Sequence, residues 1–189
     1  MTQRFARSAM LTAALMFGII HGARAVEYTD VNPTASTISF TYNQMGSRVY
    51  GTFSKFEGTL DFDTTHPEAA HATLSIDLDS IDAGSSDANE ELKKSPWFDT
   101  ATFPVATFES TGVKDLGNNR YQITGHLTLR GITREVVAPV LLKSENEIGI
   151  FDGELTLERD NFKIGEGEWA DSVVSNEINI RFRMVAPQR

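Results

Sequence analysis

Histidine is the side chain best suited to proton transfer and metal binding near neutral pH, and beyond residue 25 it occurs as His66, His71 and His126. His66 and His71 are five positions apart around an expected turn, a spacing that matches no common metal motif. His126 is out of phase with its apolar neighbours and is expected to face solvent. No serine stands in a nucleophile motif with a histidine and an orienting acid, and cysteine is absent. The sequence therefore predicts a protein that is not an enzyme.

A run of acidic residues is the second feature that could do chemistry, because carboxylate oxygens are preferred calcium ligands. The run comprises Asp77, Asp79, Asp82, Asp87, Glu90 and Glu91. Its spacing is not that of an EF-hand loop. We interpret these residues, and also Arg181 and Arg183, as the solvent-facing positions of strands and of a helix.

The first 25 residues have the three parts of a cleavable secretory signal. Arg4 and Arg7 precede an apolar run from Ala9 to Ile20, and Ala23-Arg24-Ala25 follows it. A membrane anchor is the alternative, but this run is about half the roughly 20 residues of a spanning helix. We expect a signal peptide at residues 1–25, export to the periplasm and one mature domain at residues 26–189.

Composition and charge limit the function classes. The chain has 189 residues, 40% hydrophobic and 23% charged, which indicates one globular domain with a sizeable core. It holds 26 acidic and 17 basic residues, a formal charge of -9. The signal holds three of the arginines and no acid, so the mature chain has 14 basic and 26 acidic residues and a charge of -12. This field disfavours nucleic acid as a partner.

Apolar residues of the mature chain recur at every second position, which predicts β-strands with one buried face. Clear sets are Ile38, Phe40 and Tyr42; Phe56, Leu60 and Phe62; Ala72, Leu74, Ile76 and Leu78; Tyr121, Ile123, Leu127 and Leu129; and Ile178, Ile180, Phe182 and Met184. Their short connections predict an all-β, eight-stranded, antiparallel up-and-down barrel, with a sandwich as the alternative. Pro139 cannot donate a ladder hydrogen bond and predicts a bulge or a frayed seam.

One stretch interrupts the alternation and predicts a short helical insertion. Asp87-Ala88-Asn89-Glu90 can form a capping box for a helix that runs through Lys94 and ends before Pro96. The large apolar residues that follow are Trp97, Phe98 and Phe103. Such residues beside a helical crossover either plug one end of a barrel or cover its mouth.

Several motifs in this order resemble the YceI-like family of secreted bacterial proteins. They are residues 51–58 (GTFSKFEG), 79–84 (DSIDAG), 92–99 (LKKSPWFD), 103–111 (FPVATFEST) and 125–134 (GHLTLRGITR). Residues 162–169 also resemble a subgroup related to domains fused to cytochrome b561 membrane proteins. The chain departs from the family at Ala35, where relatives commonly carry histidine, and at Lys163, where many carry glycine.

The resemblance implies a lipocalin-like barrel that binds a polyisoprenoid lipid. The side chains expected to line its lumen are Phe40, Tyr42, Phe53, Phe56, Leu60, Phe62, Leu74, Ile76, Phe98, Phe103, Phe108, Ile123, Leu127, Trp169, Ile180 and Phe182. Tyr42, Lys163 and Trp169 are expected at the mouth. Gly51, Gly58 and Gly125 would enlarge the lumen if they face inward, or would mark bulges instead.

The sequence and the resemblance together predict a periplasmic, non-catalytic binding protein. Its lumen would hold the tail of a polyisoprenoid lipid or isoprenoid quinone, bound non-covalently for transport or storage, with no other cofactor. The alternative is an interaction module that docks with a membrane redox protein of the cytochrome b561 type. A second copy of the chain is a further candidate partner.

Overall fold

The structure is a computed structural model that describes residues 25–167 and 173–189. Its strands are β1 (Glu27–Thr29), β2 (Thr37–Gln44), β3 (Ser47–Phe53), β4 (Phe56–Asp63), β5 (His71–Asp77), β6 (Ile81–Asp82), β7 (Val105–Gly117), β8 (Arg120–Leu129), β9 (Ile132–Glu145), β10 (Ile148–Glu158) and β11 (Glu177–Pro187). The helices are α1 (Ser86–Lys93) and the short 3-10 helices η1 (Pro67–Ala69), η2 (Leu78–Ser80) and η3 (Arg159–Phe162). The signal predicted at residues 1–25 lies outside the described residues except for Ala25, so export stays a prediction.

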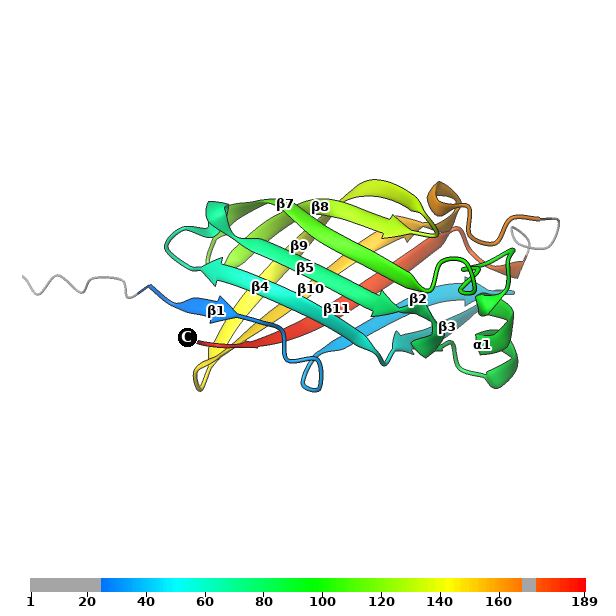
Figure 1. Ribbon diagram of the computed structural model, residues 1–189, viewed down its shortest axis with the longest axis horizontal. Coiled ribbons are helices and arrows are strands. Elements are labelled where there is room, and N and C mark those ends of the chain that lie inside the picture. Colours follow the sequence, from blue (N-terminus) through cyan, green and yellow to red (C-terminus); the bar gives the residue numbers. More distant parts are fainter. Residues whose placement is uncertain (1–24, 168–172) are drawn as a thin grey trace, which may run out of the picture.

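The strands form a single antiparallel sheet in the order β1-β4-β5-β7-β8-β9-β10-β11-β2-β3-β6. The sheet curls into an elongated barrel, with α1 at one end and the C-terminus at the other (Figure 1). A bridge between Tyr28 and Gln188 and a hydrogen bond from Asn32 N–H to the Val185 carbonyl (2.7 Å) tie the segment around β1 to β11. The predicted all-β antiparallel fold with one short helix is confirmed.

The predicted count of eight strands is not confirmed, because the described residues form eleven. Three extended stretches of the chain are each divided into two strands by residues that are not in the sheet. Residues 30–36 separate β1 from β2, residues 54–55 separate β3 from β4, and η2 separates β5 from β6. The pairing resumes after the first break with a shift of one residue, since Tyr28 pairs with Phe62 and Ile38 pairs with Phe53. Alternation runs through such breaks, so it does not reveal where hydrogen bonding stops.

Pro139 lies where the wall of the barrel changes its pairing. The ladder between β8 and β9 passes through the Gln122–Pro139 pair, whereas the ladder between β9 and β10 ends at Val140–Gly153. Proline cannot donate on the β10 side and so terminates pairing there. The predicted seam is therefore present beside β10, without a bulge in the β8–β9 ladder.

The short helix α1 forms where the sequence predicts it but begins earlier. Its N-cap is Ser85, whose Oγ accepts a hydrogen bond from the Ala88 N–H at 3.2 Å. The predicted cap, Asp87, is instead in the first helical turn.

A second local correction concerns Leu78, which lies in η2 and not in a strand. The Asp77 carboxylate accepts a hydrogen bond from the Asp79 N–H at 3.0 Å, and this contact turns the chain.

Aromatic side chains fill the end of the barrel opposite α1. Tyr28 and Phe62 are 1% and 2% exposed and form one buried cluster with Tyr121 and Phe151. The rings meet edge to face, with centroids 5.0 to 5.5 Å apart, an arrangement that the aromatic quadrupole favours. This cluster, which we call the aromatic plug, leaves the α1 end as the end at which a cavity can open.

Candidate functional site: an apolar cavity

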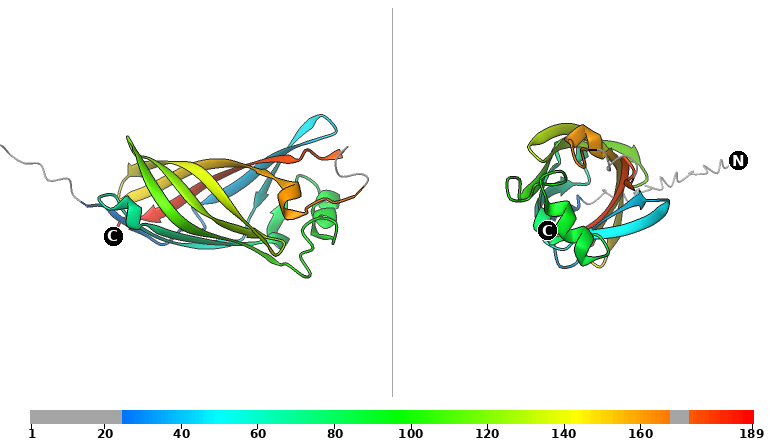
Figure 2. Two further views of the ribbon diagram at one scale, coloured as in Figure 1. Left: turned by 90° about the horizontal axis from the view of Figure 1, so that it is seen from above. Right: turned by 90° about the vertical axis from the view of Figure 1, so that its right-hand side faces the viewer.

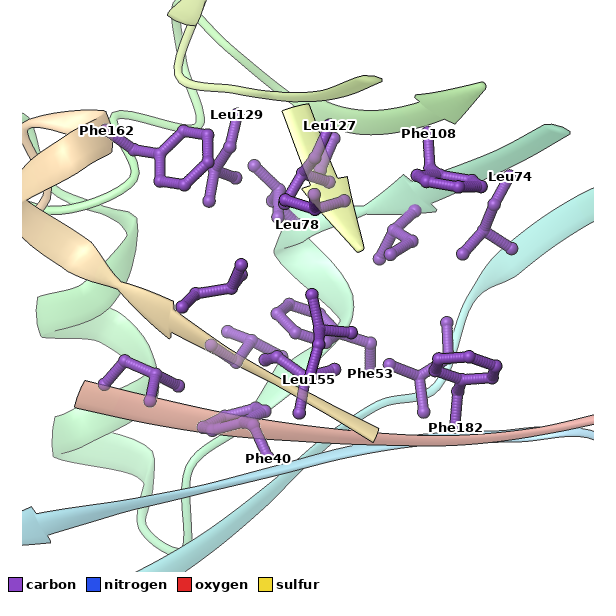
Figure 3. A pocket seen from close by; sticks show the side chains of 18 of the residues that line it. Phe40, Phe53, Leu74, Leu78, Phe108, Leu127, Leu129, Leu155, Phe162 and Phe182 are labelled. Carbon is purple, nitrogen blue, oxygen red and sulfur yellow. The ribbon is translucent and has the colours of Figure 1, made fainter. Parts of the chain in front are cut away.

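A cavity of about 320 Å³ lies inside the barrel, at the lower end of the range of about 300–1,000 Å³ typical of small-molecule sites. Figure 3 shows phenylalanine and leucine side chains pointing into it from opposite walls. Its lining is apolar except for Tyr42, Gln44, Thr59, Thr73, Glu91 and Arg159. Such a lining suits a slender hydrocarbon, because contact with apolar groups is non-directional and removes the guest from water.

Most of the side chains predicted to line the lumen do line this cavity. They are Phe40, Tyr42, Phe53, Leu60, Leu74, Ile76, Phe98, Phe108, Ile123, Leu127, Ile180 and Phe182. They come from seven strands and from the segment after α1, so the barrel brings together residues far apart in the sequence. Their role in ligand binding stays a prediction.

The other predicted lumen residues lie elsewhere. Phe62 belongs to the aromatic plug. Phe103 lies against Gly131, where an added Cβ would be 2.8 Å from its Cε1, because the turn after β8 lies beside the segment that leads into β7. Phe56 pairs with Ile76 across β4 and β5 but is not among the lining residues. Trp169 lies outside the described residues.

Of the three glycines that could enlarge the lumen, Gly51 and Gly125 face inward beneath aromatic rings. A Cβ added to Gly51 would be 2.2 Å from the Phe40 Cζ, and one added to Gly125 would be 2.4 Å from the Phe108 ring. Gly58 is in phase with Leu60 and lies not beneath a ring but against the Thr73 carbonyl and the aliphatic side chains of Leu74 and Val31, both of which line the cavity. The missing side chains at Gly51 and Gly125 let both rings lie close to the wall, which leaves the axis of the barrel open.

Arg159 is the lining residue that sequence reasoning missed most clearly. It is the first residue of η3 and follows Leu155 and Leu157 of β10 at the same two-residue spacing, and all three line the cavity. A charged residue in phase with inward-facing leucines was the available signal. Its neighbours Phe162 and Ile164, also missed, line the same end of the cavity.

The Arg159 guanidinium holds together the chain at this end of the barrel. The residue is 4% exposed. Its Nη1 donates to the Ile164 carbonyl at 2.9 Å and to the Asp160 carboxylate at 3.0 Å, while Nη2 donates to the Val174 carbonyl at 3.2 Å. Hydrogen bonds of this kind offset the cost of burying a cation. Arg159 is therefore suited to a structural role at the edge of an otherwise apolar cavity.

The polar lining residues near α1 mark the mouth. Tyr42 packs in a cluster with Leu92 of α1 and with Val174, and Gln44 forms a bridge with Val174. Burial raises the pKa of the Tyr42 phenol, so this group stays protonated and can donate a hydrogen bond. The Lys94 ammonium lowers the pKa of Glu91, and the Trp97 indole acts in the same direction. A ligand's polar end would meet a phenol, an amide and a carboxylate here.

Lys163, predicted at the mouth, is exposed and does not line the cavity. Its φ of 54° and ψ of 37° place it in the left-handed region, at the C-cap of η3. Glycine is favoured in this conformation, so Lys163 occupies a backbone position that suits glycine better than lysine. The Lys163 carbonyl accepts a hydrogen bond from Arg130, which also donates to the Ser95 carbonyl at 2.6 Å.

The other polar groups of the sequence lie on the outside. His66, His71 and His126 are exposed, and the described residues contain no group of three or more His, Asp or Glu that could hold a metal ion. Arg181 pairs with Glu154 at 3.1 Å and Arg183 pairs with Asp152 at 2.7 Å, on the outer face of β10 and β11. Within residues 25–167 and 173–189, no helix has the length and apolar character needed to cross a bilayer.

Comparison with known proteins places this barrel among relatives. Residues 30–186 match the family model of the YceI-like domain. A UPF0312 protein of Azotobacter vinelandii is 35% identical over 61% of each chain. The crystal structure of Burkholderia cenocepacia BcnA has a TM-score of 0.80 and 36% identity, covering 83% of this chain and 99% of that one.

A more distant structure shares the fold. It is a polyisoprenoid binding domain from Saccharophagus degradans implicated in plant cell wall breakdown, with a TM-score of 0.66 and 18% identity over 85% of this chain and 98% of that one. None of these comparisons bears on docking to a redox protein or on a dimer, and both stay predictions. Since the family match covers most of the sequence, the chain belongs to the YceI-like family.

Proposed function

We propose that the protein is a non-catalytic binding protein whose barrel holds the apolar tail of a polyisoprenoid lipid. The observation that carries this proposal is the cavity of about 320 Å³ with an almost entirely apolar lining. The polyisoprenoid binding domain of the same fold supports it. The signal-like N-terminus favours the periplasm as the compartment, where a carrier or store would keep such tails out of water.

The energetics suit a tail better than a compact polar ligand. Each methylene moved from water to the cavity contributes roughly 0.8 kcal/mol, and the ordering of a flexible chain opposes this gain. The aromatic plug closes the far end, so the tail would enter past α1 and lie along the axis. Its polar end would remain near Tyr42, Gln44 and Glu91. An isoprenoid quinone fits this arrangement, because its carbonyl oxygens can accept a hydrogen bond from the Tyr42 phenol.

Quenching of Trp97 fluorescence tests the proposal, since this indole lines the cavity and quinones quench tryptophan emission. Delipidated protein is titrated with a short-tailed prenyl quinone and with the same quinone lacking its prenyl tail. We expect saturable quenching with one tailed quinone per chain, and much weaker quenching by the tailless compound. A Trp97→Phe variant separates this signal from that of the second tryptophan. Equal weak quenching by both compounds would refute tail binding.

A further inference from the structure

The turn between β2 and β3 carries a residue that the local structure does not explain. Met45 and Gly46 are its two central residues, with φ of 49° and 82°. Two-residue hairpin turns of this kind favour Asn-Gly, because a residue with a bulky side chain is strained at positive φ. The β7–β8 turn of the same chain uses Asn118 and Asn119 at φ of 54° and 59°. Methionine at this position therefore carries a conformational cost that asparagine would reduce.

Burial does not offset this cost, because Met45 is 80% exposed. Tyr50, on the following strand, is 66% exposed. Arg48 lies between them and is also exposed. A strained apolar residue at the tip of a hairpin, with an exposed tyrosine and arginine below it, has the composition of segments that enter the interface of a lipid bilayer. We call Met45, Arg48 and Tyr50 the hairpin tip.

The hairpin tip lies beside the mouth of the cavity. Gln44 directly precedes Met45 and lines the cavity. The hairpin, drawn in light blue, projects from the same end of the barrel as α1, away from the C-terminus (Figure 2). The end closed by the aromatic plug carries its own exposed apolar residue, Leu116, which is 50% exposed. The exposed apolar residue at the α1 end is therefore next to the mouth of the cavity, whereas the one at the opposite end is next to the aromatic plug.

Contact between the mouth and a bilayer would lower the main barrier to loading the cavity, which is the passage of an apolar tail through water. Every methylene that must cross water on the way into the cavity disfavours transfer by roughly fourfold. A mouth held against the membrane surface shortens or removes that passage. The partner that the hairpin tip binds is therefore a lipid surface, from which the tail enters the cavity.

We propose that the hairpin tip docks the mouth of the barrel on a bilayer, with Met45 inserted among the lipid chains and Tyr50 at the headgroup level. This inference rests on the proposed function, because docking serves the transfer of a polyisoprenoid tail. Arg48 faces the phosphate groups of the lipids. The net negative charge of the chain directs this contact to zwitterionic membranes, since anionic surfaces repel it.

Co-sedimentation with phosphatidylcholine vesicles tests the docking, with full-length mature protein and a Met45→Asn variant. Asparagine tolerates the left-handed conformation, so M45N is expected to have an equal or higher melting temperature. Its vesicle affinity is expected to fall roughly tenfold, the worth of one buried methionine side chain. A Leu116→Asn variant removes an apolar residue of similar exposure from the opposite end and is expected to bind vesicles like the native chain.

Two further measurements separate docking from tail binding. In vesicles that contain a long-tailed prenyl quinone, M45N is expected to extract the quinone more slowly, while its affinity for a short-tailed quinone in solution stays native. Failure of the native chain to sediment with vesicles, or an equal loss in M45N and L116N, would overturn the docking. If the native chain does not bind the short-tailed quinone in solution, the proposed function itself is refuted.

Discussion

The ring of Phe182 lies over Gly153 on the inner wall of the barrel. The two residues are directly opposite in the ladder between β10 and β11. A Cβ added to Gly153 would lie 2.2 Å from the Phe182 Cζ and within 2.9 Å of two further ring atoms. The three atoms nearest to such a Cβ all belong to this ring. The absence of a side chain at Gly153 therefore lets the ring lie against the wall instead of across the cavity.

Replacing Gly153 by alanine is expected to turn the Phe182 ring toward the axis and to reduce the room for a tail. The affinity for a short-tailed prenyl quinone should fall several-fold, while the melting temperature changes little, because the ring can move. The double variant G153A/F182L is the control, since a smaller side chain opposite the added methyl group is expected to restore affinity. Native affinity in G153A would show that the ring position does not limit the cavity.

Phe108→Asp is expected to abolish tail binding, because a carboxylate facing the apolar cavity opposes the entry of hydrocarbon. Thr107→Asp introduces the same group at the adjacent exposed position of β7 and is expected to bind the quinone like the native chain. Circular dichroism establishes that both variants are folded. Unchanged affinity in a folded F108D protein would argue that the tail does not pass this residue.

Lys163→Gly is expected to stabilise the protein by about 1 kcal/mol, because a non-glycine residue in the left-handed region carries a penalty of about that size. For a chain of this length the melting temperature should rise by about 2–4 °C. Lys163→Ala keeps the penalty while removing the charge, and its melting temperature is expected to stay near the native value. A similar rise in both variants would mean that the ammonium group, not the backbone, destabilises this turn.

Acid is expected to weaken the barrel partly through Asp152. The Arg183 guanidinium and the Lys143 ammonium, at 2.7 and 2.9 Å, lower the pKa of this carboxyl in the folded state. A lowered folded pKa gives stability that is present above the unfolded value of about 3.9 and is lost as the pH falls through the folded value. The contribution is below about 1 kcal/mol, since the partners are largely exposed.

Urea unfolding of native and Asp152→Asn protein across this pH range measures the contribution. The difference in unfolding free energy should be largest above about pH 5 and should shrink below about pH 4. Glu154→Gln, which breaks the exposed pair with Arg181, is the matched control and should show a smaller difference. A difference for D152N that is constant with pH would exclude the carboxylate as its source.

The strands and their inward faces could be predicted from the sequence because alternation reports which side of a sheet is buried. Ile38, Phe40 and Tyr42 alternate in sequence and are all buried in the structure. The breaks could not be predicted in this way. At residues 54–55 the Lys55 N–H donates to the Ser80 Oγ at 3.0 Å, a contact between distant segments that local pattern does not contain.

The cavity itself was only partly predictable. The sequence identifies apolar inward residues but not which of them fill an end and which line a space. Phe62 and Leu60 are neighbours in one alternating set, yet Phe62 is in the aromatic plug and Leu60 lines the cavity. That difference depends on Tyr121 and Phe151, which reach Phe62 from other strands. Arg159 was missed although its spacing from Leu155 and Leu157 was a signal, because contacts such as those to the Ile164 and Val174 carbonyls are not contained in the local sequence pattern.

The central claim is that a polyisoprenoid tail occupies the barrel. Mass spectrometry of lipid extracted from protein purified without detergent from its native cells tests it most directly. The account predicts a polyisoprenoid lipid near one molecule per chain in the native protein, and a strongly reduced amount in F108D purified in parallel. A native protein that yields no polyisoprenoid, or the same amount as F108D, would contradict it.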